Sequence, residues 1–342
     1  MATLSTRFPT LMDAAIAYDP DKKGIANVAE LLSQTNEMLA DMPWAEANGP
    51  TGHTSVVRTG LPASTWRKLY EGVQPTKSSR AKITDAIGML EQRSEVDKAL
   101  AELNGMAADF MLDEARAHIE GMNQDMQSTV IYGDTAVNPE RFTGLAARYN
   151  ALSGFEAAQN VVNAGGTTNS DHSSMWLVVW GMNTVHGIFP KGSMAGLQRD
   201  DLGLGDAFDT ASPAGRYRAY MEHFVWKAGL TVRDWRYVVR ICNIEVSDLA
   251  GAGLGSATQA STSATNLVRC MIAALHRVPN LRMGRPVFYA NRPTREALDK
   301  LAMEKSSGVA MLMDAAGQFS TAFRGVPIKT CDALLTTEAA LA

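Results

Sequence analysis

Cysteine is scarce in this sequence, and the few that occur lie far apart. The three cysteines, Cys242, Cys270 and Cys331, show none of the short spacings that hold a structural metal ion. We therefore expect small buried side chains in a protein of a reducing compartment. The pattern excludes a cysteine-based metal site.

Long hydrophobic runs and a strong charge of one sign are also missing. No apolar stretch approaches the ~18 residues that a membrane-spanning helix needs, and the opening MATLSTRFPTLMDAAIAYDP lacks the basic and apolar regions of a secretion signal. A net charge of −4 over 342 residues gives no support for a nucleic-acid-binding protein. We expect a soluble protein that has no membrane contact.

Familiar catalytic motifs are absent as well. The chain contains no P-loop, no nucleophile elbow and no zinc-binding H-E-x-x-H. GAGLGS, residues 251–256, has serine at its sixth position and no βαβ pattern around it, which favours a surface loop over a dinucleotide site. The sequence NSDHSS around His172 favours a polar loop, because the members of a catalytic triad converge from distant segments. We expect neither an enzyme nor a cofactor.

What the chain does have is an aromatic-rich stretch, FVWKAGLTVRDWRYVVRICNI, at residues 224–244. Apolar residues alternate with period two as far as Val232 and change parity beyond Asp234. A shift of one residue exchanges the two faces of a strand. This pattern predicts one long strand with a bulge or sharp twist near Asp234.

The clearest helical pattern covers residues 94–126, where apolar residues recur at every third or fourth position. Ser94 is the predicted N-cap, with Asp97 three residues later. At 1.5 Å per residue such a helix would be about 45–50 Å long. It carries eight acidic and two basic residues.

The rest of the chain predicts an irregular mixture of helices and strands, the α+β class. In residues 44–93, basic side chains outnumber acidic ones. The expected segments are an extended arm over 1–24, a helix from Ile25 to Leu39, two paired strands separated by a polar turn-rich segment within 44–93, strands in 174–190, helices at 266–278 and 294–304, a strand at 285–290 and a last strand near 325–334.

Four longer segments carry a resemblance to a known family. They are STVIYGDTAVNPERFTGLAARYNALSG, NVVNAGG, SMWLVVWGMNTVHGIFPKGSMAGLQRDDLG and WKAGLTVRDWRYVVRICNI. This region, from Ser128 to Ile244, closely resembles the major capsid proteins of short-tailed, double-stranded DNA bacteriophages. Residues 1–127 are similar mainly in architecture, and residues 245–342 more loosely.

The resemblance implies the Hong Kong 97 (HK97) capsid fold and leaves open whether its strand order is permuted. The expected parts are an N-terminal arm (1–43), an extended E-loop hairpin (44–93), the long spine helix and P-domain strands with A-domain insertions (94–245), and mainly A-domain with a return to the P-domain (246–342).

The resemblance also implies a structural function. Copies of the chain would form the hexamers and pentamers of an icosahedral virion shell around the DNA genome, after assembly in the host cytoplasm. The implied partners are a portal protein and a separate scaffolding protein, and non-specific contact with packaged DNA is also implied. Whether a decoration or cement protein binds is left open. Two alternatives remain, an encapsulin-type nanocompartment shell and a soluble α+β enzyme.

Two sets of residues follow from these expectations. Side chains on the E-loop should meet acidic side chains on the spine helix of a neighbouring subunit; the first set comprises Arg58, Arg67, Lys68, Arg80, Lys82, Asp109, Asp113 and Glu120. Tryptophans should fill the P-domain core; the second set comprises Trp176, Trp180, Trp226 and Trp235.

Overall fold

The computed structural model describes residues 18–19, 24–25, 34–102, 107–166, 171–208, 215–250, 260–303, 309–313 and 319–341. Most of the expected N-terminal arm, much of the helix expected from Ile25 to Leu39, and the glycine-rich 251–256 lie outside these residues. Within the described part, that helix is represented by α2 (Glu37–Asp41).

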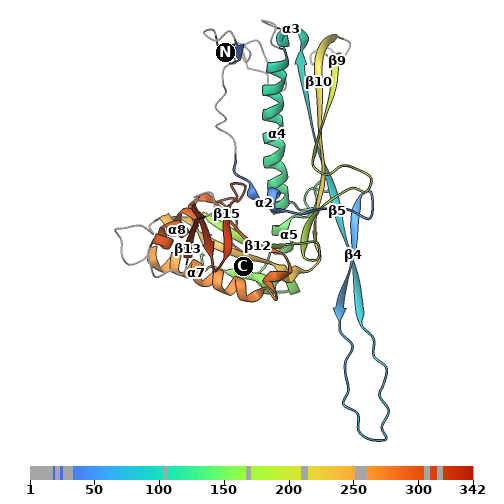
Figure 1. Ribbon diagram of the computed structural model, residues 1–342, viewed down its shortest axis with the longest axis vertical. Helices are drawn as coiled ribbons and strands as arrows, with labels where there is room; N and C mark the ends of the chain where they lie inside the picture. Colours follow the sequence, from blue (N-terminus) through green and yellow to red (C-terminus); the bar gives the residue numbers. More distant parts are fainter. Residues whose placement is uncertain are drawn as a thin grey trace. The chain divides into compact units, whose positions relative to one another are not determined.

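The chain forms two compact units that each combine distant segments. One unit contains Met1–Gln34, Met89–Met126 and Gly196–Lys227, and the other contains Thr35–Gly88, Gln127–Ala195 and Ala228–Ala342. Both units contain helices and strands, as the α+β class requires (Figure 1).

The larger unit is built on a mixed sheet whose strand order is β13-β14-β15-β12-β7-β11-β6. β7 is central: it pairs antiparallel with β11 and with β12. The strands are β6 (Val161–Asn163), β7 (His172–Trp180), β11 (Val238–Glu245), β12 (Arg285–Ala290), β13 (Val309–Met313), β14 (Phe319–Phe323) and β15 (Val326–Thr330).

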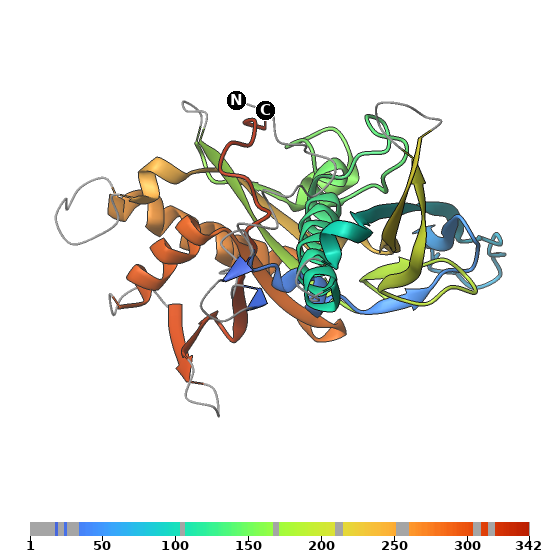
Figure 2. The same cartoon turned by 90° about the horizontal axis from the view of Figure 1, so that it is seen from above.

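Apolar residues on both faces explain why β7 lies at the centre, since every residue of this strand is buried. One face, with Met175 and Leu177, packs with side chains of α7 (Ala260–Arg277) and α8 (Arg292–Met303) (Figure 2). The other face carries Trp176 and Trp180, both buried. The strands expected at 174–190 and 285–290 and the last strand are confirmed by β7, β8, β12 and β15.

A second group of strands in this unit leads to a long hairpin. β8 (Val185–Phe189) pairs antiparallel with β10 (Arg216–Val232) and parallel with β3 (Trp44–Glu46). The hairpin consists of β4 (Gly52–Gly60) and β5 (Ser79–Asp97), which pair antiparallel. The paired strands expected in 44–93 are therefore confirmed.

The smaller unit packs a helix on a ribbon of strands in which β10 pairs with both β9 (Leu197–Phe208) and β5. In the ribbon, β9 pairs with the first part of β10, and the helix is the first part of α4 (Ala107–Tyr132). Phe224 is buried against Ala115 and Met122 of α4, and Trp226 packs at the margin of this cluster. The ring of His118 stacks on Phe224, with centroids 5.5 Å apart.

The single strand expected over 224–244 is wrong. β10 ends at Val232, a 3-10 turn occupies Trp235–Tyr237, and β11 begins at Val238. The side chain of Asp234 caps the turn by accepting a hydrogen bond from the backbone N–H of Arg236 (3.0 Å). The parity change in the sequence marks a break between two strands with different partners, because both strands are buried on both faces near it.

The expected helix start was also misplaced. Ser94 is a buried residue of β5, and the N-cap is Asp97, whose carboxylate accepts from the N–H of Ala99 (2.8 Å). A short helix, α3 (Lys98–Ala101), follows this cap, and α4 continues to Tyr132 instead of ending at residue 126. Strand pairing therefore outweighed the local capping signal.

Candidate subunit-contact surface

The β4–β5 hairpin is held at its base by local hydrogen bonds. The side chain of Asn48 donates to the carbonyl of Thr54 (2.7 Å) and accepts from its N–H (2.8 Å). Farther out, Thr59 Oγ1 donates to Ser79 Oγ (3.1 Å). These contacts fix where the two strands begin and where their pairing ends.

One face of the hairpin concentrates positive charge. The strand register places Arg58 opposite Arg80 and Val56 opposite Lys82, and all four side chains are exposed. Like charges directly opposite on a strand pair are destabilising. This face therefore gains stability from any acidic surface that covers it.

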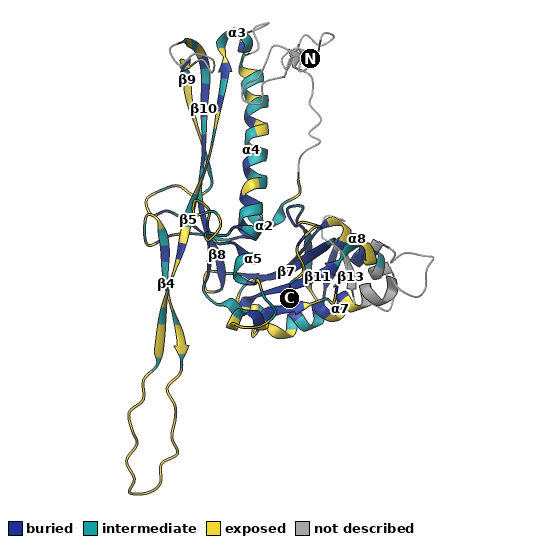
Figure 3. Cartoon of the chain, turned by 180° about the vertical axis from the view of Figure 1, so that it is seen from behind, coloured by how far each residue is buried: buried dark blue, intermediate teal, exposed yellow. Residues whose placement is uncertain are grey.

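The outer part of the hairpin is apolar as well as exposed. Residues 61–77 are all exposed, and Trp66 and Tyr70 are each 100% exposed (Figure 3). Leu61 and Leu69 are exposed at 80% and 82%. So much apolar surface in one segment is typical of a binding site. These four residues were not predicted from the sequence, although their apolar side chains in a turn-rich segment were a usable signal.

The hairpin cations predicted from the sequence pair with no acidic side chain that the structure describes. Among the described residues, no ion pair involves these five exposed side chains, Arg58, Arg67, Lys68, Arg80 and Lys82. They are available to a partner.

The predicted acidic partners lie on α4. Asp109 is exposed and Asp113 is half-buried. Exposed apolar side chains, Leu112 and Ile119, accompany them. Glu120 is already engaged, because its Oε1 accepts from Gln124 Nε2 (2.8 Å) and from the backbone N–H of Gln34 (2.9 Å). A surface with both apolar and acidic character suits the aromatic and basic hairpin.

The four predicted core tryptophans differ in burial. Trp176 and Trp180 are buried, whereas Trp226 and Trp235 are half-buried. The indole N–H of Trp180 donates to the hydroxyl of Tyr289 (2.8 Å). Trp235 lies in the 3-10 turn and lines a groove, because the strand expected at its position is interrupted.

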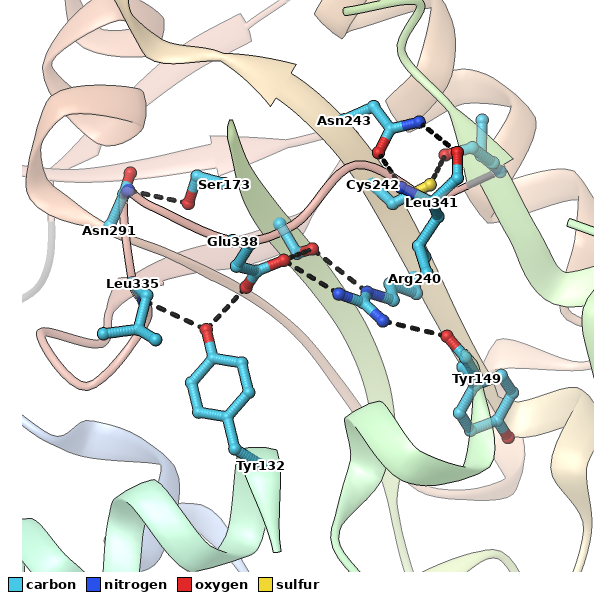
Figure 4. Close-up of polar contacts among 12 residues, drawn as sticks. Tyr132, Tyr149, Ser173, Arg240, Cys242, Asn243, Asn291, Leu335, Glu338 and Leu341 are labelled. Atoms are coloured by element: carbon cyan, nitrogen blue, oxygen red, sulfur yellow. Dashed lines mark hydrogen bonds and ion pairs between the residues drawn. The ribbon is translucent and has the colours of Figure 1, made fainter. Parts of the chain in front are cut away.

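A buried ion pair anchors the C-terminal segment to the larger unit (Figure 4). Arg240 Nη2 donates to Glu338 Oε2 at 2.8 Å, and both side chains are only 6% exposed. The same carboxylate accepts hydrogen bonds from Ser174 and from the hydroxyl of Tyr132 (2.5 Å). Arg240 also donates to the carbonyl of Tyr149 (2.9 Å). Burial and Glu338 raise the pKa of Tyr132, so its phenol stays protonated and donates.

A second buried carboxylate anchors the N-terminal side of the described chain. Asp41 accepts from the hydroxyl of Tyr289 and from Lys329 Nζ, both at 2.8 Å, and Arg285 lies at 3.1 Å. Neither buried carboxylate was predicted from the sequence, because its partners lie far away along the chain.

The polar residues around His172 are each engaged separately. His172 begins β7, so the polar loop expected there is a strand start. The hydroxyl of Ser173 accepts from the amide of Asn291 (2.8 Å), and that of Ser174 binds Glu338. In the described part of the chain, no group of three or more His, Cys, Asp or Glu residues is arranged to hold a metal ion. No described helix has the length and hydropathy of a membrane span.

The chain is similar over its whole length to a protein of known structure. The chain is 33% identical to the protein in the structure of bacteriophage epsilon15, with a TM-score of 0.74 over 100% of this chain and 99% of that one. A bacteriophage JBD30 capsid chain is 9% identical, with a TM-score of 0.47 over 90% of this chain and 95% of the other.

An encapsulin of Synechococcus elongatus is 10% identical, with a TM-score of 0.40 over 64% of this chain and 92% of the other. The 33% identity to the epsilon15 protein over the whole chain supports a phage capsid protein over the encapsulin alternative. No curated protein gives a significant match.

The family comparison covers most of the chain. The model of the major capsid protein GP7 family matches residues 19–342. Together with the epsilon15 relative, this match agrees with the mixed α+β architecture and the unpartnered hairpin. The chain therefore belongs to the GP7 family of phage major capsid proteins and has the HK97-type capsid fold.

Proposed function

We propose that each copy of this capsid protein holds its neighbour in the icosahedral shell through the β4–β5 hairpin. The observation that carries the proposal is the fully exposed pair Trp66 and Tyr70 at the outer part of the hairpin. A monomer gains nothing from ordering such side chains in solvent, whereas a shell covers them at every repeat.

The parts of the HK97 fold are assigned to the chain as follows. Residues 1–43 form the N-terminal arm and 44–93 the E-loop, which contains the hairpin. Residues 94–245 supply the spine helix and P-domain strands with A-domain insertions, and 246–342 supply mainly A-domain. The long helix α4 and the central strand β7 support these assignments.

The surface that receives the hairpin is the spine helix of the adjacent subunit. Asp109 and Asp113 face the hairpin cations, and Leu112 and Ile119 supply apolar contact for the aromatic side chains. Glu120 joins this contact less readily, because two hydrogen bonds within its own unit already occupy it. Each exposed ion pair contributes only ~0–1 kcal/mol, so the charges set the register and the apolar residues add most of the attraction.

Two of the four tryptophans fill the core of the P-domain, and the other two lie at its margin. Trp176 and Trp180 are already buried in the single chain. Trp226 and Trp235 keep part of their surface exposed, which leaves area for a neighbouring subunit to cover.

The remaining partners follow from a shell that packages a genome. A portal protein and a separate scaffolding protein act during assembly in the host cytoplasm, and a decoration protein is a further candidate. Contact with packaged DNA is weak and non-specific, since the net charge is −4. The chain has no catalytic role and needs no cofactor.

Electron microscopy of two forms of the protein tests this proposal. The purified full chain should form icosahedral particles, by itself or with its scaffolding protein. Trp66→Ser/Tyr70→Ser should give a folded subunit, with an unchanged circular dichroism spectrum, that forms no particles. Normal particles from this double variant would refute the role of the hairpin, and a wild type that never assembles would refute the shell function.

A further inference from the structure

The root of the β4–β5 hairpin contains a buried polar layer that none of the roles above uses. His53 of β4 is the register partner of Asp85 of β5, and His186 of β8 is the partner of Thr231 of β10. All four side chains are buried. The rings of His53 and His186 meet edge to face, with centroids 6.1 Å apart. The layer therefore lies where β5 of the hairpin pairs with β10 and where β10 pairs with β8.

This layer concentrates buried polar atoms that have no hydrogen-bond partner. They include both ring nitrogens of His53, Nδ1 of His186, Oδ2 of Asp85 and Oγ1 of Thr231. With Ser55 Oγ, Arg148 Nε and Arg233 Nε, the hairpin root holds eight of the sixteen such atoms in the described part of the chain. Burying a polar atom without a partner in the chain costs free energy, so the closed root is held at a cost.

The backbone around the layer is packed tightly. A Cβ on Gly229 of β10 would lie 2.7 Å from the carbonyl oxygen of Ala86 in β5. The strands thus approach each other closely beside unsatisfied polar groups. Close packing with poor hydrogen bonding favours two discrete arrangements over gradual deformation.

The charged groups near the two histidines are the guanidinium groups of Arg148 and Arg233 and the carboxylate of Asp85. Among the described residues, Asp85 is the carboxylate that faces the histidines, and it accepts from Arg148 Nη2 at 2.7 Å. Arg148 also donates to the carbonyl of Leu230 (3.2 Å), and Arg233 adds a second guanidinium. Burial, followed by Arg233, lowers the pKa of both histidines, that of His186 to about 4.

The geometry points to an acid-sensitive hinge at the hairpin root, held closed by the neutral pair His53 and His186 and opened by their protonation. Opening breaks the backbone pairing of β5 with β10, separates the hairpin from β8 and returns the ring nitrogens to water. Arg148, which binds Asp85, and Arg233, which acts on both histidines, also line an open groove of about 840 Å³.

The sign of the pH effect follows from the direction of these pKa shifts. Above pH 6.5 the rings are neutral in both states, so acidity has no effect. Below it the open state binds protons that the closed state excludes, and the closed state loses stability until the pH reaches about 4. His186 alone predicts a shift of about 100-fold toward the open state over this interval.

Hydrogen–deuterium exchange of the full-length subunit tests the hinge. After correction for intrinsic rates, peptides of residues 52–57 and 81–87 should lose about 100-fold protection between pH 7 and pH 4. Peptides of β7 should keep theirs. His53→Gln/His186→Gln should abolish this difference, and the exposed His276→Gln should leave it intact. Equal protection of the wild-type root at both pH values would overturn the proposal.

A titration of the histidine rings by NMR keeps the test independent of whether the double variant folds. Both buried rings should stay neutral well below pH 6.5 in the wild type. Rings that titrate near 6.5 while the root stays protected would also overturn the hinge. Because the hinge belongs to the single chain, its failure leaves the shell function untouched.

Discussion

Arg58 and Arg80 are register partners on adjacent strands, and both side chains are exposed on the same face of the hairpin. Repulsion between these like charges destabilises every free subunit. An acidic surface on a neighbouring subunit would turn this unfavourable interaction into a favourable one. The pair thus connects the sequence of one strand to the assembly of many chains.

Charge reversal on the hairpin should block assembly. Arg67→Glu/Lys68→Glu/Arg80→Glu is expected to give folded subunits that form no particles, because their hairpins would repel the acidic helix of a neighbour. Size-exclusion chromatography and negative-stain microscopy measure this outcome. The control is the same change at three other exposed cations, Lys191, Arg269 and Arg282. Particles from the hairpin variant would leave apolar contacts as the cause of assembly.

Assembly of the wild type should slow as salt rises. Between about 0.01 M and about 1 M the Debye length falls from about 30 Å to about 3 Å, so exposed charges steer encounters less. Light scattering measures the rate. A rate that stays constant or rises with salt contradicts electrostatic steering.

Tryptophans in the core and on the hairpin should differ in their effect on stability. Trp176→Ala should lower the free energy of unfolding by about 3–5 kcal/mol, because it leaves a cavity in the sheet core. Trp66→Ala should change it by no more than about 0.5 kcal/mol, since that side chain is fully exposed. Urea denaturation of unassembled subunits compares the two. Similar midpoints for both variants would show that the burial of Trp176 is unimportant.

Replacing the carboxylate of the C-terminal anchor should lower the free energy of unfolding. Glu338→Gln leaves the buried guanidinium of Arg240 without its counter-ion, which typically costs about 3–5 kcal/mol. Glu140→Gln, at an exposed position, is the matched control and should be neutral. Equal denaturation midpoints for these two variants would mean that the ion pair adds nothing to stability.

Local patterns in the sequence predicted the parts of the fold that local forces determine. The apolar run of β7 predicted a buried strand, and the paired segments in 44–93 predicted the hairpin. The end of the strand at Val232 was not predictable. Both neighbouring strands are buried on both faces, so alternation of apolar residues does not show where one strand ends and the next begins. Strand pairing of Ser94 likewise overrode a good capping signal.

The candidate site likewise contains residues that the local sequence predicts and residues that only the fold brings together. Charge counting found the hairpin cations but not the apolar side chains beside them, because single exposed hydrophobic residues are common on any surface. The pair Arg240 and Glu338 is separated by 98 residues. No spacing rule connects such residues before the sheet brings them together.

Disulfide trapping between subunits tests the central claim most directly. The three native cysteines are buried, so Arg67→Cys/Asp109→Cys and Arg67→Cys/Asp113→Cys place new thiols on the hairpin and on α4. In assembled particles, mild oxidation should join neighbouring chains into a ladder of covalent multimers on a non-reducing gel. Arg67→Cys with Glu140→Cys is the control and should give no ladder. Particles of normal appearance in which both α4 pairs remain monomeric on the gel would contradict the contact between hairpin and helix.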